Sequence, residues 1–129
     1  MQFCSLNGRI ESIKESSNYL IDWNGSSLSK FQKRVKDFLY KLWRNDIVFE
    51  ELPVLGTRLR FDFYNDTRKI AVEVDGNSHY KYNTYFHKNK GAFLDQLVRD
   101  DKKEEFCELN NIRLIRIYER DMLTANLFK

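Results

Sequence analysis

The sequence predicts a single α/β domain with a central mixed β-sheet flanked by helices. Two helical patterns lie at residues 28–43 and 93–110, and short runs with the alternation of half-buried strands lie between and after them. Their order is helix, three strands, a long connection, helix and strand, which is typical of a small layered α/β domain. The 129 residues make one ordinary domain, and 42% hydrophobic residues suffice for a packed core.

The polar, serine-rich residues 1–26 form an N-terminal extension to a predicted core at residues 27–120. Ile10 and Ile13 together with the run 19–23 could form a small hairpin around a serine-rich turn.

The first helix is predicted over residues 28–43, because the apolar residues from Leu28 to Trp43 recur at helical spacing. Ser29 followed by Gln32 fits a capping box at its start. A strand over residues 47–52 follows and is stopped by Pro53.

Two runs then face each other across the turn at residues 65–68. In the run 58–64, Leu59, Phe61 and Phe63 alternate with polar residues and are expected to share one face. In the run 69–75, Ile70, Val72 and Val74 are expected on one face, and Ala71, Glu73 and Asp75 on the other.

The apolar pattern of these runs also predicts their pairing. If the apolar faces align, Phe61 opposes Val72 and Asp62 opposes Ala71, so that Glu73 becomes the diagonal neighbour of Asp62 on the same face. Diagonal neighbours lie about 7–8 Å apart, a separation that two carboxylates can bridge through a metal ion. We therefore expect Asp62 and Glu73 to converge.

The segment 77–92 is too long and polar for a tight turn, and a second helix is predicted over residues 93–110. A last strand is predicted over residues 112–118. On the second helix one face carries Gln96, Asp100, Lys103 and Cys107, while Leu94, Leu97 and Leu109 are expected to make apolar contacts.

The overall charge and the cysteines are weak indicators of a partner and a compartment. The net charge of +3 slightly favours a nucleic-acid partner. Cys4 and Cys107 lie far apart and form no CxxC pair, which favours a reduced, cytoplasmic protein without a zinc site. No secretory segment and no membrane-spanning apolar run is evident, so we expect no membrane association.

The convergent acids favour hard divalent cations, because Mg²⁺ (or Mn²⁺) prefers one or two carboxylates together with substrate phosphate oxygens. Asp62 and Glu73 are the predicted metal ligands. His79, just past the second strand, is a candidate general acid or base, since imidazole titrates near neutral pH. Asp100 and Lys103 could complete the polar cluster, or they could be an ordinary helical ion pair.

The segment after Glu73 is predicted to contact nucleic acid. Lys81, Lys88 and Lys90 can neutralise phosphates, and Tyr82 is one of several interleaved aromatic residues that can stack on bases. The alternative is a surface loop anchored by its aromatic residues.

The ordered set Asp62, Glu73 in the segment VEVDG, His79, Asp100 and Lys103, followed by the strand LIRI, resembles the PD-(D/E)XK nuclease superfamily. The likeness is closest to the branch of very-short-patch-repair endonucleases and related phage homing endonucleases, which has an E-D-x-H-D constellation. It covers about residues 28–118.

This resemblance implies a single nuclease domain with a restriction-endonuclease-like fold and magnesium-dependent cleavage of double-stranded DNA. Asp62 would be the first metal ligand, Glu73 would occupy the x position, and His79 and Asp100 would be the histidine and the final aspartate.

Two positions depart from the superfamily pattern. Its lysine normally follows the second acid by two residues, where this chain has Asp75, so either His79 takes that role or Lys103 has migrated to it. The early helical glutamate has no clear match: Gln32 stands near the expected place, and Glu50 and Glu51 are the nearest acids on the first strand. Gln32 is therefore a further candidate site residue.

Two other functions remain open on the sequence alone. One is a non-catalytic nucleic-acid-binding module with a nuclease-like fold, and the other is an RNA-directed nuclease. The small size suggests a homodimer or a partner protein that supplies specificity, and a phage-encoded enzyme would act in the host-cell cytoplasm.

Overall fold

The computed structural model describes residues 1–75 and 90–129. Along the chain, its strands and helices are β1 (Gln2–Cys4), β2 (Ile10–Ser12), the 3₁₀ helix η1 (Ser16–Tyr19), α1 (Lys30–Trp43), β3 (Val48–Pro53), β4 (Arg60–Asn65), β5 (Ile70–Asp75), α3 (Lys90–Leu109), β6 (Arg113–Tyr118) and the 3₁₀ helix η3 (Ala125–Phe128).

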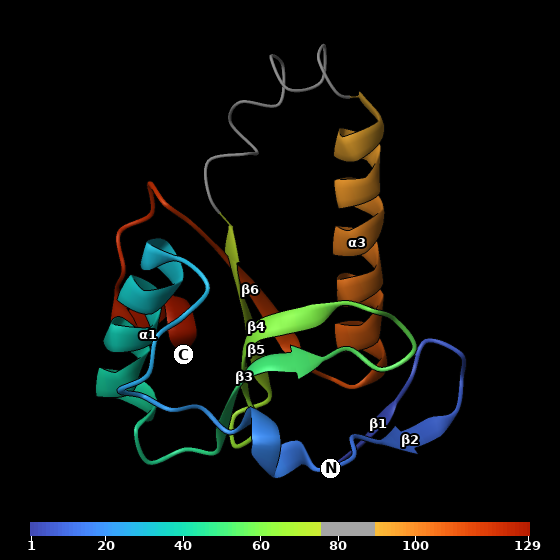
Figure 1. Ribbon diagram of the computed structural model, residues 1–129, viewed down its shortest axis with the longest axis horizontal. Helices are drawn as coiled ribbons and strands as arrows, with labels where there is room; N and C mark the ends of the chain where they lie inside the picture. Colours follow the sequence, from blue (N-terminus) through green and yellow to red (C-terminus); the bar gives the residue numbers. More distant parts are fainter. Residues whose placement is uncertain (76–89) are drawn as a thin grey trace.

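The central sheet has four strands in the order β3-β4-β5-β6. The first two neighbouring pairs are antiparallel, whereas β5 and β6 are parallel, so α3 lies on the crossover connection that a parallel pair requires. Figure 1 shows α1 and α3 on opposite sides of this sheet. The predicted class, α/β with a central mixed sheet flanked by helices, is confirmed, and the order of the predicted elements is correct.

Each face of the sheet has its own apolar core. Residues of the core on the α1 side are Val35, Leu39, Trp43, Val48, Phe63, Ile70, Val72, Ile117 and Phe128. Residues of the core on the α3 side are Phe3, Ile13, Phe49, Leu52, Val54, Phe61, Tyr64, Ala71, Phe106, Cys107 and Ile112. The alternation predicted for β5 is confirmed, since Ile70 and Val72 belong to one core and Ala71 to the other.

The N-terminal residues contain a hairpin, but not the predicted one. Gln2–Cys4 pairs antiparallel with Ile10–Ser12, whereas residues 16–19 form a 3₁₀ helix. The hairpin packs onto the domain, because Phe3 and Ile13 are buried in the core on the α3 side and the Phe3 ring lies 5.4 Å from that of Phe106. The pairing was mispredicted because three-residue strands carry too short an alternation to reveal their partner.

Helix α1 begins at Lys30, directly after the predicted N-cap Ser29 and two residues later than the predicted range of 28–43. The Ser29 side chain accepts a hydrogen bond from the Gln32 backbone N–H at 3.0 Å, so the predicted N-cap is confirmed. The rest of the capping box is absent, because the Gln32 side chain turns to β3 instead. Leu28 lies before the helix and is 78% exposed, so its assignment to the apolar stripe was wrong.

The pairing of β4 with β5 differs from the prediction by two residues. Phe63, rather than Phe61, pairs with Val72, and Tyr64 pairs with Ala71. One residue beyond the Phe63–Val72 pair, the same register puts Asp62 directly opposite Glu73. The two acids converge nonetheless, because Asp62 alternates with Phe63 and Glu73 with Val72, and Phe63 and Val72 lie in the same core.

A second difference is that Phe61 and Phe63 do not share a face. Phe61 packs in the core on the α3 side and Phe63 in the core on the α1 side. On β3, Glu51 has the left-handed φ of 58°, and it lies between Glu50, which pairs with Phe63, and Leu52, which pairs with Phe61. Both strands therefore change face at the row that contains Glu51 and Asp62.

Helix α3 begins at Lys90, three residues before the predicted start. Phe106 and Cys107 are buried, and burial raises the pKa of the Cys107 thiol to about 12, as suits a packed thiol. Leu94, Leu97 and Leu109 are about half exposed, so the apolar contacts expected of them are partial. In the described residues no helix is both long and apolar enough to cross a membrane.

Candidate active site

Asp62 and Glu73 lie side by side on the neighbouring strands β4 and β5. The Asp62 backbone N–H donates to Glu73 Oε2 at 3.1 Å, and the Val74 backbone N–H donates to Asp62 Oδ2 at 2.7 Å. Each carboxylate thus accepts from a backbone N–H of the opposite strand, in a row where the strands would otherwise bond to each other. The structure brings together the two acids that the sequence selects as metal ligands.

Lys103 approaches this pair of acids from helix α3, which packs against the sheet. It extends from α3, and its Nζ forms an ion pair with Glu73 Oε1. Both side chains are largely buried, with 17% of the Lys103 side chain and 3% of that of Glu73 exposed. The predicted cluster therefore contains a carboxylate from β4, a carboxylate from β5 and an ammonium from α3.

One ammonium does not balance the negative charge at this point. Burial, and next the charge of the Glu73 carboxylate, raise the pKa of Asp62 to about 8. In the absence of another cation, Asp62 therefore holds a proton through much of the neutral range. A positive charge brought close to Asp62 would lower its pKa and so favour the ionised carboxylate.

A third acid, Glu51, lies on β3 in the same row as Asp62, so the strand order puts Glu51 and Glu73 on the two sides of Asp62. Its Oε1 accepts from Gln32 Nε2 at 3.1 Å, and the same amide nitrogen lies 3.0 Å from Glu50 Oε2. Two consecutive residues can reach one amide because the left-handed backbone at Glu51 breaks the strand alternation. Burial raises the pKa of Glu51, and the charges of Glu50 and Glu73 add to this effect against the hydrogen bond from Gln32.

The predicted site residue Gln32 is therefore close to acids, but to Glu50 and Glu51 rather than to Asp62. Its side chain is buried, with 4% exposed, although it is polar and belongs to the first turn of a helix. Burial without its hydrogen bonds would be costly, which explains why the amide is fixed against β3.

Asp100 lies on the same helix as Lys103 but has different contacts. The Arg116 guanidinium of β6 lies 3.3 Å from Asp100 Oδ1, 3.4 Å from Glu104 Oε1 and 3.9 Å from Asp75 Oδ2. Burial acts to lower the pKa of Arg116, but the charges of these three carboxylates outweigh it and raise the pKa. This cluster borders the Asp62–Glu73 pair, because Asp75 follows Glu73 on the same face of β5.

The other predicted site residues are not placed. His79, Lys81, Tyr82 and Lys88 lie outside the described residues, and Lys90 is described only as the first residue of α3. Their predicted roles therefore stay predictions.

Sequence reasoning missed Lys36 and Arg116. Lys36 is 1% exposed, and its Nζ lies 2.9 Å from Glu50 Oε1. A helical lysine and a strand arginine are normally read as surface residues. A usable signal existed in the helix, because Lys36 stands directly after the buried Val35 and four residues after Gln32, on the face that covers the sheet.

Glu51, Asp62 and Glu73 lie in one row across β3, β4 and β5, and this row of acids offers carboxylate oxygens, the donors that a hard divalent cation prefers. In the part of the chain that the structure describes, no group of three or more His, Cys, Asp or Glu side chains is arranged to hold a metal ion. Magnesium is often held by only one or two carboxylates, with water and substrate oxygens completing its coordination, so Asp62 and Glu73 stay the predicted ligands.

Comparison with known proteins gives relatives without a described activity. No family model matches the chain, and no solved structure matches it. It is 38% identical over 65 residues to uncharacterized protein 033L of Invertebrate iridescent virus 3, a match that covers 50% of this chain and 34% of that protein. It is 44% identical over 59 residues to uncharacterized protein 307L of Invertebrate iridescent virus 6, a match that covers 46% of this chain and 30% of that protein.

A third relative is uncharacterized protein 094L of Frog virus 3, 36% identical over 66 residues, covering 50% of this chain and 43% of that protein. The chain thus spans less than half the length of each of these relatives. The chain is similar to viral proteins.

Proposed function

We propose that the chain is a divalent-metal-dependent endonuclease that hydrolyses phosphodiester bonds of double-stranded DNA. The observation that carries this proposal is the meeting of Asp62, Glu73 and Lys103, which come from two strands and the opposite helix. The resemblance to PD-(D/E)XK nucleases supports it, as does the sheet with a helix on each face, and a restriction-endonuclease-like fold is part of the proposal.

In this proposal Asp62 and Glu73 hold Mg²⁺ or Mn²⁺. When bound, such an ion supplies positive charge to the phosphate and lowers the pKa of a coordinated water. Lys103 places a further positive charge beside Glu73, where it stabilises the negative charge that develops on the phosphate. Lys103 thereby takes the role of the superfamily lysine, in place of the residue at position 75.

The remaining parts of the proposal concern residues outside the described ones and the setting of the reaction. His79 is kept as the candidate general acid or base, and Lys81, Tyr82, Lys88 and Lys90 as contacts to DNA. A homodimer or a partner protein would supply specificity. Because the relatives are viral, the proposed place of action is the cytoplasm of the host cell.

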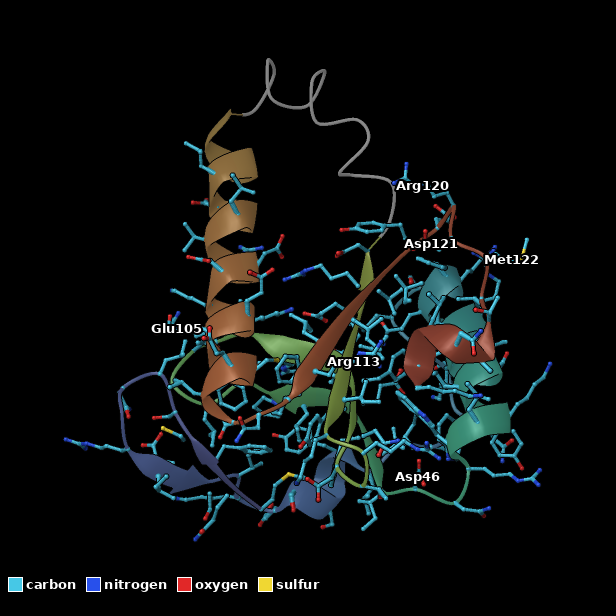
Figure 2. All side chains as sticks on the ribbon, turned by 180° about the vertical axis from the view of Figure 1, so that it is seen from behind. Asp46, Glu105, Arg113, Arg120, Asp121 and Met122 are labelled. Atoms are coloured by element: carbon cyan, nitrogen blue, oxygen red, sulfur yellow. The ribbon has the colours of Figure 1, made fainter. Side chains whose placement is uncertain are left out.

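The test is cleavage of supercoiled plasmid DNA by the purified chain in Mg²⁺, in Mn²⁺ and in EDTA. We expect nicked or linear product only with metal, and none with Asp62→Asn or Glu73→Gln, because each loses a charged ligand with little change in size. Matched controls are Asp101→Asn and Glu105→Gln, at exposed positions of α3, and both variants should cleave like the parent. Figure 2 labels Glu105 on this helix.

Three results would contradict parts of the proposal. Cleavage in EDTA, or by both acid variants at the parent rate, excludes the metal site. Tight DNA binding with no cleavage in either metal favours the non-catalytic binding module. Cleavage of a matched RNA duplex in preference to DNA favours the RNA-directed nuclease.

A further inference from the structure

A cavity of about 450 Å³ lies beside the row of acids, between the segment of residues 18–28, α1 and β3. Its volume lies in the range of small-molecule sites, which are typically about 300–1,000 Å³. Tyr19 and Leu28 contribute aromatic and apolar surface to its lining, and Lys36, Glu50 and Glu51 contribute charged groups.

Two of these charged groups satisfy each other. Lys36 Nζ lies 2.9 Å from Glu50 Oε1 and donates to the carbonyl oxygens of Gly25 at 3.2 Å and Ser26 at 3.4 Å. Glu50 Oε2 in turn accepts from the Ser27 hydroxyl at 2.7 Å and from the Gln32 amide. These two side chains form a fixed, neutral part of the wall.

Glu51 differs from them. Within the described part of the chain its hydrogen bond comes from Gln32 to Oε1, so Oε2 and the second lone pair of Oε1 keep their capacity to accept. The Gln32 amide holds the carboxylate in one orientation. The cavity thus offers a positioned hydrogen-bond acceptor of negative charge next to aromatic and apolar side chains.

This combination suits a nucleobase that carries adjacent N–H donors. Among the bases, guanine presents its N1–H and N2–H groups side by side, and a carboxylate can accept both at once. The aromatic and apolar residues of the lining can cover the face of a base, as aromatic side chains do when they bind unpaired nucleotides. A negatively charged wall disfavours a phosphate at the same place.

A second cavity extends the first along the chain. Its volume is about 570 Å³, it shares residues 25–28 with the first, and it continues to Lys30 and Lys33. These ammonium groups could neutralise the phosphates that adjoin the base, although Lys33 also lies 3.0 Å from Asp37. The two cavities together form one groove that runs from Glu50 and Glu51 of β3 to Lys30 and Lys33 of α1.

We infer that this groove binds an unpaired guanine nucleotide of a DNA strand, with Glu51 accepting from guanine N1–H and N2–H and Tyr19 and Leu28 covering the base. The inference rests on the proposed function for its choice of DNA, and it gives that activity a sequence preference. Gln32 is a positioning residue for Glu51 in this arrangement.

The test is binding of short labelled single strands in EDTA, where no cleavage occurs. The probes are thymidine heptamers whose central base is thymine, guanine or hypoxanthine, which lacks the N2 amino group. Fluorescence anisotropy gives the three affinities for the parent chain, for Glu51→Gln and for the exposed control Glu105→Gln.

We expect the parent to favour the guanine strand over the thymine strand by roughly 5- to 100-fold, as for a bidentate base contact. The hypoxanthine strand should fall between them, and Glu51→Gln should lose the preference while Glu105→Gln keeps it. Equal affinity of the parent for all three strands overturns the inference, even if Glu51→Gln fails to fold. So does a preference that Glu51→Gln retains.

These outcomes are separate from those of the proposed function. If the chain prefers the guanine strand in EDTA but cleaves no DNA in either metal, the endonuclease proposal is wrong and the guanine-binding groove is supported. If the chain cleaves DNA with metal but shows no preference for the guanine strand, the guanine-binding groove is wrong and the endonuclease proposal is supported.

Discussion

Two buried Lys–Glu ion pairs, one on each face of the sheet, consist of the same two groups but have different surroundings. Lys36 of α1 pairs with Glu50 of β3, and Lys103 of α3 pairs with Glu73 of β5. In both cases a helix places an ammonium on a strand carboxylate, and both lysine side chains are largely withdrawn from water.

The difference lies in the neighbours. Around Lys36 and Glu50, two backbone carbonyls, a serine hydroxyl and an amide complete the hydrogen bonds, so the charges are balanced. Beside Glu73 lies a second carboxyl, Asp62, whose pKa is raised by burial and by the Glu73 charge, so it keeps its proton unless another cation binds. The first pair has its hydrogen bonds completed by neighbouring groups, whereas the second has beside it a carboxyl that an added cation would ionise, and substitutions in the two pairs can test this contrast.

The largest effect on a reaction rate is expected for Lys103. Lys103→Met should lower the rate of metal-dependent DNA cleavage by roughly 10²–10³-fold, as loss of a single charge-stabilising donor does in other enzymes. Single-turnover cleavage of a labelled duplex measures the rate, and Lys102→Met, an exposed neighbour, is the control. A Lys103→Met rate equal to that of the control would return the role of the superfamily lysine to His79.

The second prediction concerns the response of stability to metal. Removing one partner of a buried pair leaves an uncompensated charge, so Lys36→Met should lower the free energy of unfolding by about 3–5 kcal/mol. Lys103→Met should also destabilise the fold in EDTA, but Mg²⁺ should offset much of that loss because it supplies positive charge beside Glu73.

Urea unfolding of both variants with and without Mg²⁺ makes this measurement. Lys36→Met should gain no more from Mg²⁺ than the parent does. If the two variants respond to Mg²⁺ equally, the contrast between the two Lys–Glu pairs is wrong.

The third prediction uses the raised pKa of Asp62, about 8 in the folded chain against an ordinary 3.8. Between these values the folded state holds a proton that the unfolded state has released, so metal-free stability should fall as pH rises from 4 to 8. The slope from this group is at most about 1.4 kcal/mol per pH unit.

Asp62→Asn should flatten this part of the profile and be more stable than the parent at pH 8 in EDTA. Thermal unfolding between pH 5 and 8 measures both effects, with Asp101→Asn as the control. A parent that becomes more stable across this range would show that Asp62 is ionised in the fold without a metal.

Much of the fold was predictable because it depends on local patterns. The period of α1, its Ser29 cap and the alternation in β5 gave the right elements, and the order of the elements gave the layered sheet. Alternation from Phe63 on β4 and from Val72 on β5 put Asp62 and Glu73 on one face, even though the register was wrong by two residues and Phe61 lies on the other face. The face to which a strand residue points follows from the local alternation of apolar and polar residues, whereas the pairing register depends on the whole sheet.

The rest depends on interactions that no local pattern carries. The change of face between Phe61 and Phe63 accompanies the left-handed backbone at Glu51, and a glutamate gives no sign of that conformation. Lys36 and Arg116 are buried only because distant carboxylates surround them. His79 and the lysines of the following segment lie outside the described residues, so that part of the predicted site remains a prediction.

The smallest effect is expected for Ser29, which caps the helix that carries Lys36 without contacting either Lys–Glu pair. Ser29→Ala removes the hydrogen bond from the Gln32 N–H and should cost about 1 kcal/mol, whereas Ser29→Asp keeps an N-cap acceptor and should cost little. The cost should be equal at pH 5 and pH 8, and with or without Mg²⁺, because the cap exchanges no charge with the acids. Urea unfolding under these four conditions measures it. If the cost of Ser29→Ala grows in EDTA at pH 8, the first turn of α1 is coupled to the row of acids through Gln32, and the two Lys–Glu pairs belong to one network.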